Sequence, residues 1–191
     1  MRDASVVIET SAGEIAVDVF AQTAPRTSSY FLGLVSDGAY DGSTLYRSTT
    51  LGVENGPRLV QGGPLARVFA PGGPVVGPAP KRFDLLPDFE TTADTGLRHT
   101  AGTLSLARDL ASTGHAIPEF FVCLGDFPQL DAGGRSEPDE RGFPAFGQVT
   151  RGLALVEDIA GRATGGSSSI ERLEGEVLSS QVRIPRIALQ I

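Results

Sequence analysis

The sequence predicts a mainly β protein whose strands close into a barrel, accompanied by two helices. Short segments of β-branched and aromatic residues recur along the chain, while only two segments have the apolar spacing of a helix. Loops rich in Gly and Pro separate these segments. A closed sheet is expected because closure removes exposed edges. With 191 residues, 40% of them hydrophobic, the chain suits a single domain over 1–191.

The first predicted elements are a hairpin and a helix. Residues 6–10 and 14–19 flank the short turn Ser11-Ala12-Gly13, and apolar side chains alternate with other residues in the second segment. This pattern is typical of two antiparallel strands. A helix follows, because Pro25 fits the first turn of a helix and Gly38 suits its end.

The remaining chain contains further strands and one more helix. Leu153, Val156 and Ile159 have helical spacing, which predicts a helix over 153–160 that ends at Gly161. The predicted strands are 44–48, 58–61, 100–107, 119–124, 145–149 and 182–191. Long polar, Gly-rich or Pro-rich loops are predicted over 64–80, 133–142 and 165–169.

Composition excludes several functional classes. The net charge of −7 and the pI near 4.8 disfavour nucleic acid and anionic membranes as partners. The chain has no long apolar segment and no apolar signal segment at its start, so we expect a cytoplasmic protein, or a periplasmic one if the sequence is a processed or trimmed form. Cys123 is the only cysteine, and His99 and His115 lie far apart, so we expect no metal site.

Taken singly, the polar and aromatic residues of the strands identify no function. Arg47 on an alternating strand is typical of a solvent-facing or ion-paired side chain, and Gln61 before two glycines is typical of a strand end. The pair Phe120-Phe121 is typical of a core. No glycine motif for dinucleotides or phosphates and no nucleophile elbow is present. These residues alone predict a barrel with a polar groove.

Several segments are more informative together, in their order along the chain, than each is alone. Two of them are Leu59-Val60-Gln61-Gly62-Gly63 and Glu119-Phe120-Phe121-Val122, and the others are 23–27, 40–47, 93–100, 102–108 and 145–149. Together they resemble the cyclophilin family of peptidyl-prolyl isomerases, in particular its bacterial branch. The resemblance spans nearly the whole chain. It implies an eight-stranded antiparallel barrel with a helix at each end and an active groove on its outer face.

The resemblance also implies roles for individual residues. Arg47 corresponds to the catalytic arginine of the family, and Gln61 corresponds to the glutamine that orients the arginine and the substrate carbonyl. The implied proline pocket consists of Phe121 as its floor, Leu59 and Leu130 as its walls, and Phe143 at its edge. Ala107 and Arg108 fall where backbone groups of the family hold the substrate chain. The implied reaction requires no cofactor.

Several groove positions depart from the family's pattern. Arg58 stands where the family usually has a phenylalanine of the proline pocket, and Glu119 replaces a glutamine. Both are predicted to contact substrate. Glu119 could pair with Arg47 and compete with its catalytic role, pair with Arg58, or point to solvent, and the sequence leaves these alternatives open. Gln129 replaces the tryptophan of cyclosporin-sensitive members, so weak cyclosporin binding is expected.

The leading functional hypothesis is a peptidyl-prolyl isomerase that acts as a monomer on proline-containing peptides and unfolded chains. The alternative is a cyclophilin-like module that binds proline segments or a protein partner with little turnover. Arg47 and Gln61 favour the enzyme, whereas Arg58 and Glu119 favour the module. A third hypothesis, a barrel hydrolase using carboxylates such as Glu119 and Asp126, requires an acid–base pair that the sequence does not place.

Overall fold

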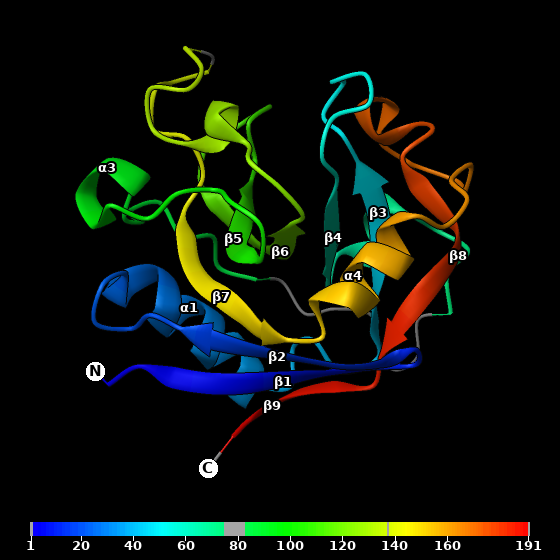
Figure 1. The fold of residues 1–191 in the computed structure, drawn as a ribbon, viewed down its shortest axis with the longest axis horizontal. Coiled ribbons are helices and arrows are strands. Elements are labelled where there is room, and N and C mark those ends of the chain that lie inside the picture. The colour runs from blue at the N-terminus through cyan, green and yellow to red at the C-terminus, as the bar shows by residue number, and fades with distance from the viewer. Residues whose placement is uncertain (1, 75–82, 137, 191) are drawn as a thin grey trace.

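The computed structural model describes residues 2–74, 83–136 and 138–190, and these form an antiparallel sheet that curves into a barrel (Figure 1). The sheet has nine strands in the order β8-β3-β4-β6-β5-β7-β2-β1-β9. They are β1 (Ala4–Thr10), β2 (Gly13–Val19), β3 (Ser43–Thr49), β4 (Leu59–Gly63), β5 (Thr103–Arg108), β6 (Ala116–Cys123), β7 (Ala145–Arg151), β8 (Val177–Ile184) and β9 (Arg186–Leu189). The predicted mainly β barrel is confirmed.

The ninth strand exists because Pro185 divides the strand that was predicted over 182–191. Proline has no backbone N–H for a sheet ladder, so the chain leaves β3, the partner of β8, and pairs again with β1 as β9. Because β8 and β9 are consecutive, the chain itself joins the two ends of the sheet. The N–H of Ser11, directly after β1, donates to the carbonyl of Arg183 at 2.9 Å and helps to close the barrel.

Both predicted helices are present as α1 (Pro25–Ser36) and α4 (Leu153–Ala160). In Figure 1 they lie apart, α1 at the lower left and α4 at the centre right. Phe31 of α1 and Ile159 of α4 are fully buried in the same apolar cluster as the inner side chains of the barrel. The short elements are α2 (Ala66–Phe69), α3 (Thr92–Thr95) and two 3-10 turns, Pro128–Leu130 and Glu171–Leu173. No helix in the described ranges is long and apolar enough to cross a bilayer.

Strand alternation divides the apolar residues between two clusters. On β6, Phe120 and Val122 point into the barrel core, whereas Phe121 and Cys123 belong to a second cluster on the outer face. On β4, Val60 likewise points inward and Leu59 outward. The outer cluster is the apolar surface on which the groove described below is built.

A bulge in β3 sets the direction of Arg47. The register passes from Leu45 opposite Gly62 to Arg47 opposite Gln61, so Tyr46 is an extra residue on this strand. The pairing of β3 with β8 shifts at the same place. An extra residue reverses the alternation beyond it. Arg47 therefore lies on the same outer face as Gln61.

Several predicted boundaries shift by a few residues. β5 begins at Thr103 rather than at residue 100, because Thr103 N–H bonds to the carbonyl of Thr100 in a turn that Gly102 completes with a φ of 85°. β6 begins at Ala116, before the predicted start. The predicted loop over 64–80 contains α2, and its part beyond residue 74 lies outside the described residues, as does residue 137 of the predicted loop over 133–142.

Candidate active site

The candidate site is organised around a row of side chains that crosses four strands of the barrel. The register places Arg47 of β3 opposite Gln61 of β4, Gln61 opposite Phe121 of β6, and Phe121 opposite Ser105 of β5. Residues that face each other across antiparallel strands lie on the same side of the sheet. A cation, an amide and an aromatic ring from separate segments of the chain therefore form a continuous strip.

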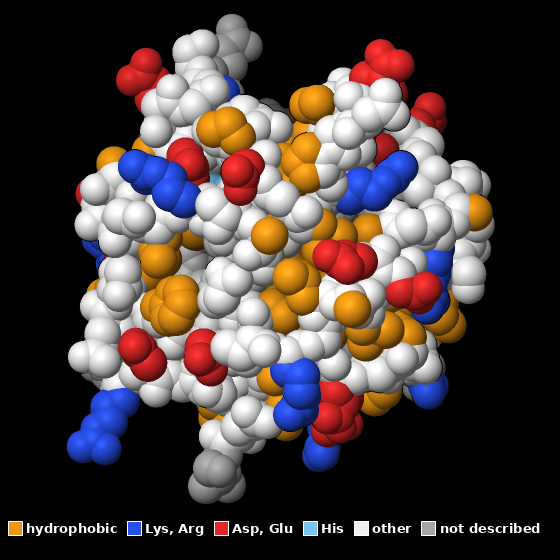
Figure 2. Space-filling model, in the orientation of Figure 1, with side chains coloured by type: hydrophobic (Ala, Val, Ile, Leu, Met, Phe, Trp, Pro, Cys, Tyr) orange, Lys and Arg blue, Asp and Glu red, His pale blue; other side chains and the backbone are white. Residues whose placement is uncertain are grey.

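A cavity of about 290 Å³ opens over this strip. The predicted site residues that line it are Arg47, Leu59, Gln61, Ala107, Arg108, Phe121, Leu130 and Phe143. Figure 2 shows the molecule hollowed at the top of the view, between two projecting lobes that carry hydrophobic side chains. Leu130 and Phe143 line the cavity from one side of β6, and Leu51 and Leu173 line it from the side of β3 and β8. The groove is therefore bounded by loops on both sides.

Phe121 lies between two other rings. Phe143 contacts it edge to face, with ring centroids 5.9 Å apart and an interplanar angle of 80°. His99 stacks against it at 5.9 Å and 19°. Leu59 and Leu130 are 2% exposed and belong to the same cluster. This arrangement gives a rigid apolar pocket of the kind that binds a small aliphatic ring.

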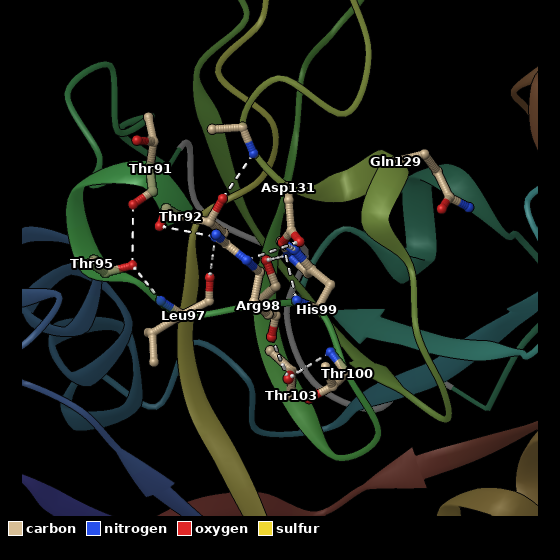
Figure 3. Close-up of polar contacts among 12 residues, drawn as sticks. Thr91, Thr92, Thr95, Leu97, Arg98, His99, Thr100, Thr103, Gln129 and Asp131 are labelled. Atoms are coloured by element: carbon tan, nitrogen blue, oxygen red, sulfur yellow. Dashed lines mark hydrogen bonds and ion pairs between the residues drawn. The ribbon is translucent and has the colours of Figure 1, made fainter.

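His99 is itself fixed by two polar partners. Its Nδ1 lies 2.8 Å from Oδ1 of Asp131, and its Nε2 lies 3.1 Å from the hydroxyl of Ser105. The backbone N–H of His99 also donates to Asp131, at 3.1 Å (Figure 3). Burial raises the pKa of Asp131, but the hydrogen bonds from His99 outweigh it, so the pKa lies below its usual value. Asp131 is therefore the anion that holds the ring beneath Phe121.

The arrangement of Ser105, His99 and Asp131 has the hydrogen-bond pattern of a hydrolytic triad, but Ser105 cannot reach a substrate. Its exposed fraction is 0%, and it lies on β5 next to Phe121, with His99 on its hydroxyl. A nucleophile needs access to the reacting carbonyl. These three residues therefore support the floor of the pocket and do not act as a hydrolytic triad. In the described part of the chain no three His, Cys, Asp or Glu side chains form a group that could hold a metal ion.

The guanidinium of Arg47 is held from two sides. Its Nη1 donates to Oε1 of Gln61 at 2.8 Å. Its Nε donates to Oε2 of Glu176 at 2.8 Å, and its Nη2 lies 2.6 Å from the same oxygen. Gln61 in turn donates from Nε2 to the hydroxyl of Tyr46 at 2.8 Å, which fixes the direction of its amide. Arg47 is thus presented to the cavity in one orientation.

The side chain of Glu119 adopts none of the three arrangements that the sequence left open. It does not line the cavity, its exposed fraction is 0%, and it pairs with neither Arg47 nor Arg58. Its Oε1 accepts a hydrogen bond from the N–H of Leu65 at 2.6 Å, and its Oε2 has no hydrogen-bond partner among the residues that the structure describes. Burial raises the pKa of Glu119 to about 7, although Leu65 and Tyr46 act in the opposite direction. The prediction that Glu119 contacts substrate is therefore not supported.

Arg58 also lies outside the groove. It is exposed before β4, lines a separate shallow hollow with Thr50 and residues 52–56, and donates from Nη1 to the hydroxyl of Ser48 at 3.3 Å. The apolar wall that its position was expected to lack is supplied in part by Leu51, which lines the cavity from the same loop. Leu51 has a φ of 53°, and its N–H bonds to the hydroxyl of Thr49. This turn directs the loop toward the groove.

Ala107 and Arg108 line the cavity at the end of β5, but the side chain of Arg108 binds outside it. It is 1% exposed and binds Asp139 through Nη1 at 3.0 Å and Nη2 at 2.6 Å. Its Nη1 and Nε also donate to the carbonyls of Gly142 and Gly114, both at 2.7 Å. Arg108 therefore ties the 139–142 loop to the barrel.

Sequence reasoning missed several residues that line the cavity, chiefly Leu51, Ile117, Arg135, Ile170, Leu173 and Glu176. Ile117 could have been found, because it shares the outward face of β6 with Phe121 once that strand is extended to Ala116. Glu176 carried no such signal. It lies before β8 and far along the chain from Arg47, and only barrel closure brings the two together.

Comparison with known proteins gives a consistent result. The sequence profile of the family described as "Cyclophilin type peptidyl-prolyl cis-trans isomerase/CLD" matches residues 5–187. Peptidyl-prolyl cis-trans isomerase B of Escherichia coli is 32% identical over 162 residues, which cover 85% of this chain and 87% of the relative. A peptidyl-prolyl cis-trans isomerase of Streptomyces antibioticus is 30% identical over 164 residues, with 85% and 87% coverage.

Solved structures share the fold. A cyclophilin-type peptidyl-prolyl cis-trans isomerase of Cryptosporidium parvum superposes with a TM-score of 0.67 at 17% identity and covers 99% of this chain and 98% of its own. A second structure of that protein, determined in the presence of the dipeptide Ala-Pro, has a TM-score of 0.66 at 18% identity. At such low identity these structures establish the similarity of fold alone.

Proposed function

The chain belongs to the cyclophilin-type peptidyl-prolyl cis-trans isomerase family and is a peptidyl-prolyl isomerase, and we propose that it rotates X-Pro bonds in the groove beside Arg47. The observation that carries this proposal is the row of Arg47, Gln61 and Phe121 along one cavity. It brings together a hydrogen-bond donor, the group that orients it and an apolar floor. Rotation about an amide requires no other chemistry.

The size of the barrier defines what the groove must supply. Rotation about an X-Pro bond breaks the C–N resonance, with a barrier of roughly 18–20 kcal/mol. Turnover on the order of a thousand per second requires the removal of about 7 kcal/mol. Interactions lower the barrier only if they are stronger in the twisted state than in either planar state.

Arg47 is suited to such a selective interaction. In a planar amide the nitrogen lone pair is delocalised, whereas in the twisted amide it becomes a hydrogen-bond acceptor. A guanidinium N–H directed at the proline nitrogen therefore stabilises the transition state more than the ground states. Gln61 fixes one side of Arg47 at 2.8 Å, and its amide lies close enough to the groove to orient a substrate carbonyl.

The apolar pocket supplies the other half of the mechanism. Phe121, Leu59 and Leu130 hold the proline ring still, so that the part of the substrate before the proline rotates. The substrates on this proposal are proline-containing peptides and unfolded chains, and the protein assists folding as a monomer. Neither a nucleophile nor a cofactor takes part in this mechanism.

The test is an isomerisation assay on X-Pro peptides, by NMR exchange or protease coupling. We expect wild type to exceed the buffer rate and Arg47→Ala to lose about 10²–10³-fold in kcat/KM. Arg151→Ala is the matched control, because Arg151 is 63% exposed and pairs with the exposed Glu14. A wild type no faster than buffer, or an Arg47→Ala variant as fast as Arg151→Ala, would contradict the proposal.

Two residues favoured the alternative of a binding module with little turnover in the sequence, and their positions no longer favour it. Arg58 and Glu119 both lie outside the cavity, so neither alters the groove as expected. The burial of Glu119 likewise removes the acid of the barrel hydrolase hypothesis. The carboxylate that does pair with Arg47 is Glu176.

A further inference from the structure

Glu176 is fixed at both carboxylate oxygens. Oε2 accepts the hydrogen bond from Arg47 Nε, and Oε1 accepts one from the hydroxyl of Thr49 at 2.5 Å. Thr49 is 3% exposed and lies on the same outer face of β3 as Arg47. The backbone carbonyl of Glu176 also accepts a hydrogen bond from the N–H of Ser48 at 3.0 Å. This carboxylate has a defined place beside β3.

The turn that carries Glu176 is anchored in a separate apolar cluster. Leu173 is 3% exposed and packs in the same cluster as Tyr46, Ala66 and Val177. Because Val177 is the register partner of Arg47, the backbone on either side of Glu176 is tied to the barrel. The position of the carboxylate therefore follows from the packing of the turn and not from the ion pair alone.

The hydrogen-bond pattern leaves part of the guanidinium free for a substrate. Arginine has five N–H donors in a planar fork. Glu176 occupies the edge formed by Nε and Nη2, and Gln61 takes one hydrogen of Nη1. One hydrogen on each of Nη1 and Nη2 remains, and Arg47, at 16% side-chain exposure, lines the cavity. Glu176 therefore fixes the plane of the fork while leaving these two hydrogens for a substrate.

We propose that Glu176 is a positioning residue of the isomerase, which acts through Arg47 by holding its guanidinium plane toward the proline pocket. The inference rests on the proposed function. The ion pair matters for the rate, because a misplacement of about 1 Å in a reacting group can cost on the order of 100-fold. Thr49 contributes indirectly, because its hydroxyl donates a hydrogen bond to Glu176 and holds that carboxylate in place.

The test compares Glu176→Gln, Glu176→Ala and Thr49→Val with wild type. Glu174→Gln is the matched control, because it removes the same charge from the same turn at an exposed position that does not line the cavity. We expect kcat/KM to fall roughly tenfold in Glu176→Gln, further in Glu176→Ala and less in Thr49→Val, with the loss in kcat and little change in KM. Glu174→Gln should match wild type.

A double-mutant cycle separates positioning from a general structural role. In the Arg47→Ala background, Glu176→Gln should cause no further loss, because it acts only through Arg47. The Nε–H resonance of Arg47 should be visible by NMR in wild type and lost in Glu176→Gln. An active wild type with an unchanged or faster Glu176→Gln variant, or an equal loss in the Arg47→Ala background, would overturn this inference alone. A wild type no faster than buffer would overturn it together with the proposed function.

Discussion

The carboxyl group of Glu119 lies against Gly63, and the space for it exists because Gly63 has no side chain. A Cβ at Gly63 would stand 2.5 Å from Oε1 of Glu119 and 3.0 Å from its Cα. Gly63 also has a φ of 149°, which other residues rarely adopt. The two residues therefore depend on each other, and the Gln61-Gly62-Gly63 segment has a structural reason for its glycines beyond the end of a strand.

Replacement of Glu119 by glutamine should stabilise the protein at alkaline pH. The carboxyl has a pKa of about 7 in the folded protein and a usual value of 4.5. Below pH 4.5 the carboxyl is protonated in both the folded and the unfolded state, so it does not lower the free energy of unfolding. As the pH rises from 4.5 to 7, the unfolded chain releases the proton first, so the folded state loses about 1.4 kcal/mol per pH unit, up to about 3 kcal/mol. Glu119→Gln lacks this titration.

The measurement is the free energy of unfolding of wild type and Glu119→Gln in denaturant at pH 5 and pH 8. The variant should be close to wild type at pH 5 and more stable at pH 8. A difference that does not change with pH would show that Glu119 has an ordinary pKa. Because Glu119 lies outside the cavity, the same substitution should leave kcat/KM within about twofold of wild type.

Gly63→Ala should destabilise the barrel by about 2–3 kcal/mol, because the new methyl group overlaps Glu119 and the backbone conformation disfavours it. Gly52→Ala is the control, since Gly52 also has a positive φ, 80°, but a Cβ added there would meet no atom within 4 Å. Thermal or denaturant unfolding of both variants separates the overlap from the backbone effect. Equal losses in the two would mean that the overlap with Glu119 contributes nothing.

Asp131→Ala should weaken substrate binding through the floor of the pocket. The substitution removes the acceptor of two His99 hydrogen bonds, so the ring that stacks on Phe121 loses its orientation. We expect KM for a proline peptide to rise about 3- to 10-fold and stability to fall by about 1–3 kcal/mol. Asp126→Ala, at an exposed position nearby, serves as the control. An unchanged KM would mean that Phe121 needs no support from His99.

Cyclosporin should bind weakly. Gln129, half-buried in the turn before Leu130, stands where cyclosporin-sensitive members have a tryptophan, and its shorter amide side chain offers less apolar area than an indole. Titration calorimetry with the wild-type protein checks this expectation. A dissociation constant below about 1 μM would contradict it.

Sequence order and residue type predicted most of the fold and half of the site. The alternation in β2 and the spacing of Leu153, Val156 and Ile159 are local properties, so this strand and α4 could be placed before any contact was known. Pro185 is a local signal that divides the last strand into β8 and β9. The resemblance placed Arg47, Gln61 and Phe121 together, and the register confirms that they adjoin.

Other features depended on contacts between distant segments. Neither the direction of the Glu119 side chain nor the exposed position of Arg58 follows from a motif. Both are set by the space that neighbouring strands leave, such as the gap at Gly63 and the hollow beside residues 50–56. A one-residue bulge at Tyr46 likewise decides which way Arg47 points. Such steric fit depends on contacts between segments that come together only when the chain folds.

The sequence by itself determined the family, the barrel and the identity of Arg47, Gln61 and Phe121, because those depend on the order and type of residues along the chain. The tertiary structure alone decided that Arg47 is held by Glu176. Closure of the sheet places β8 beside β3, and the packing of Leu173 and Val177 sets the carboxylate against the guanidinium. Two residues so far apart along the chain become partners because the barrel closes on itself.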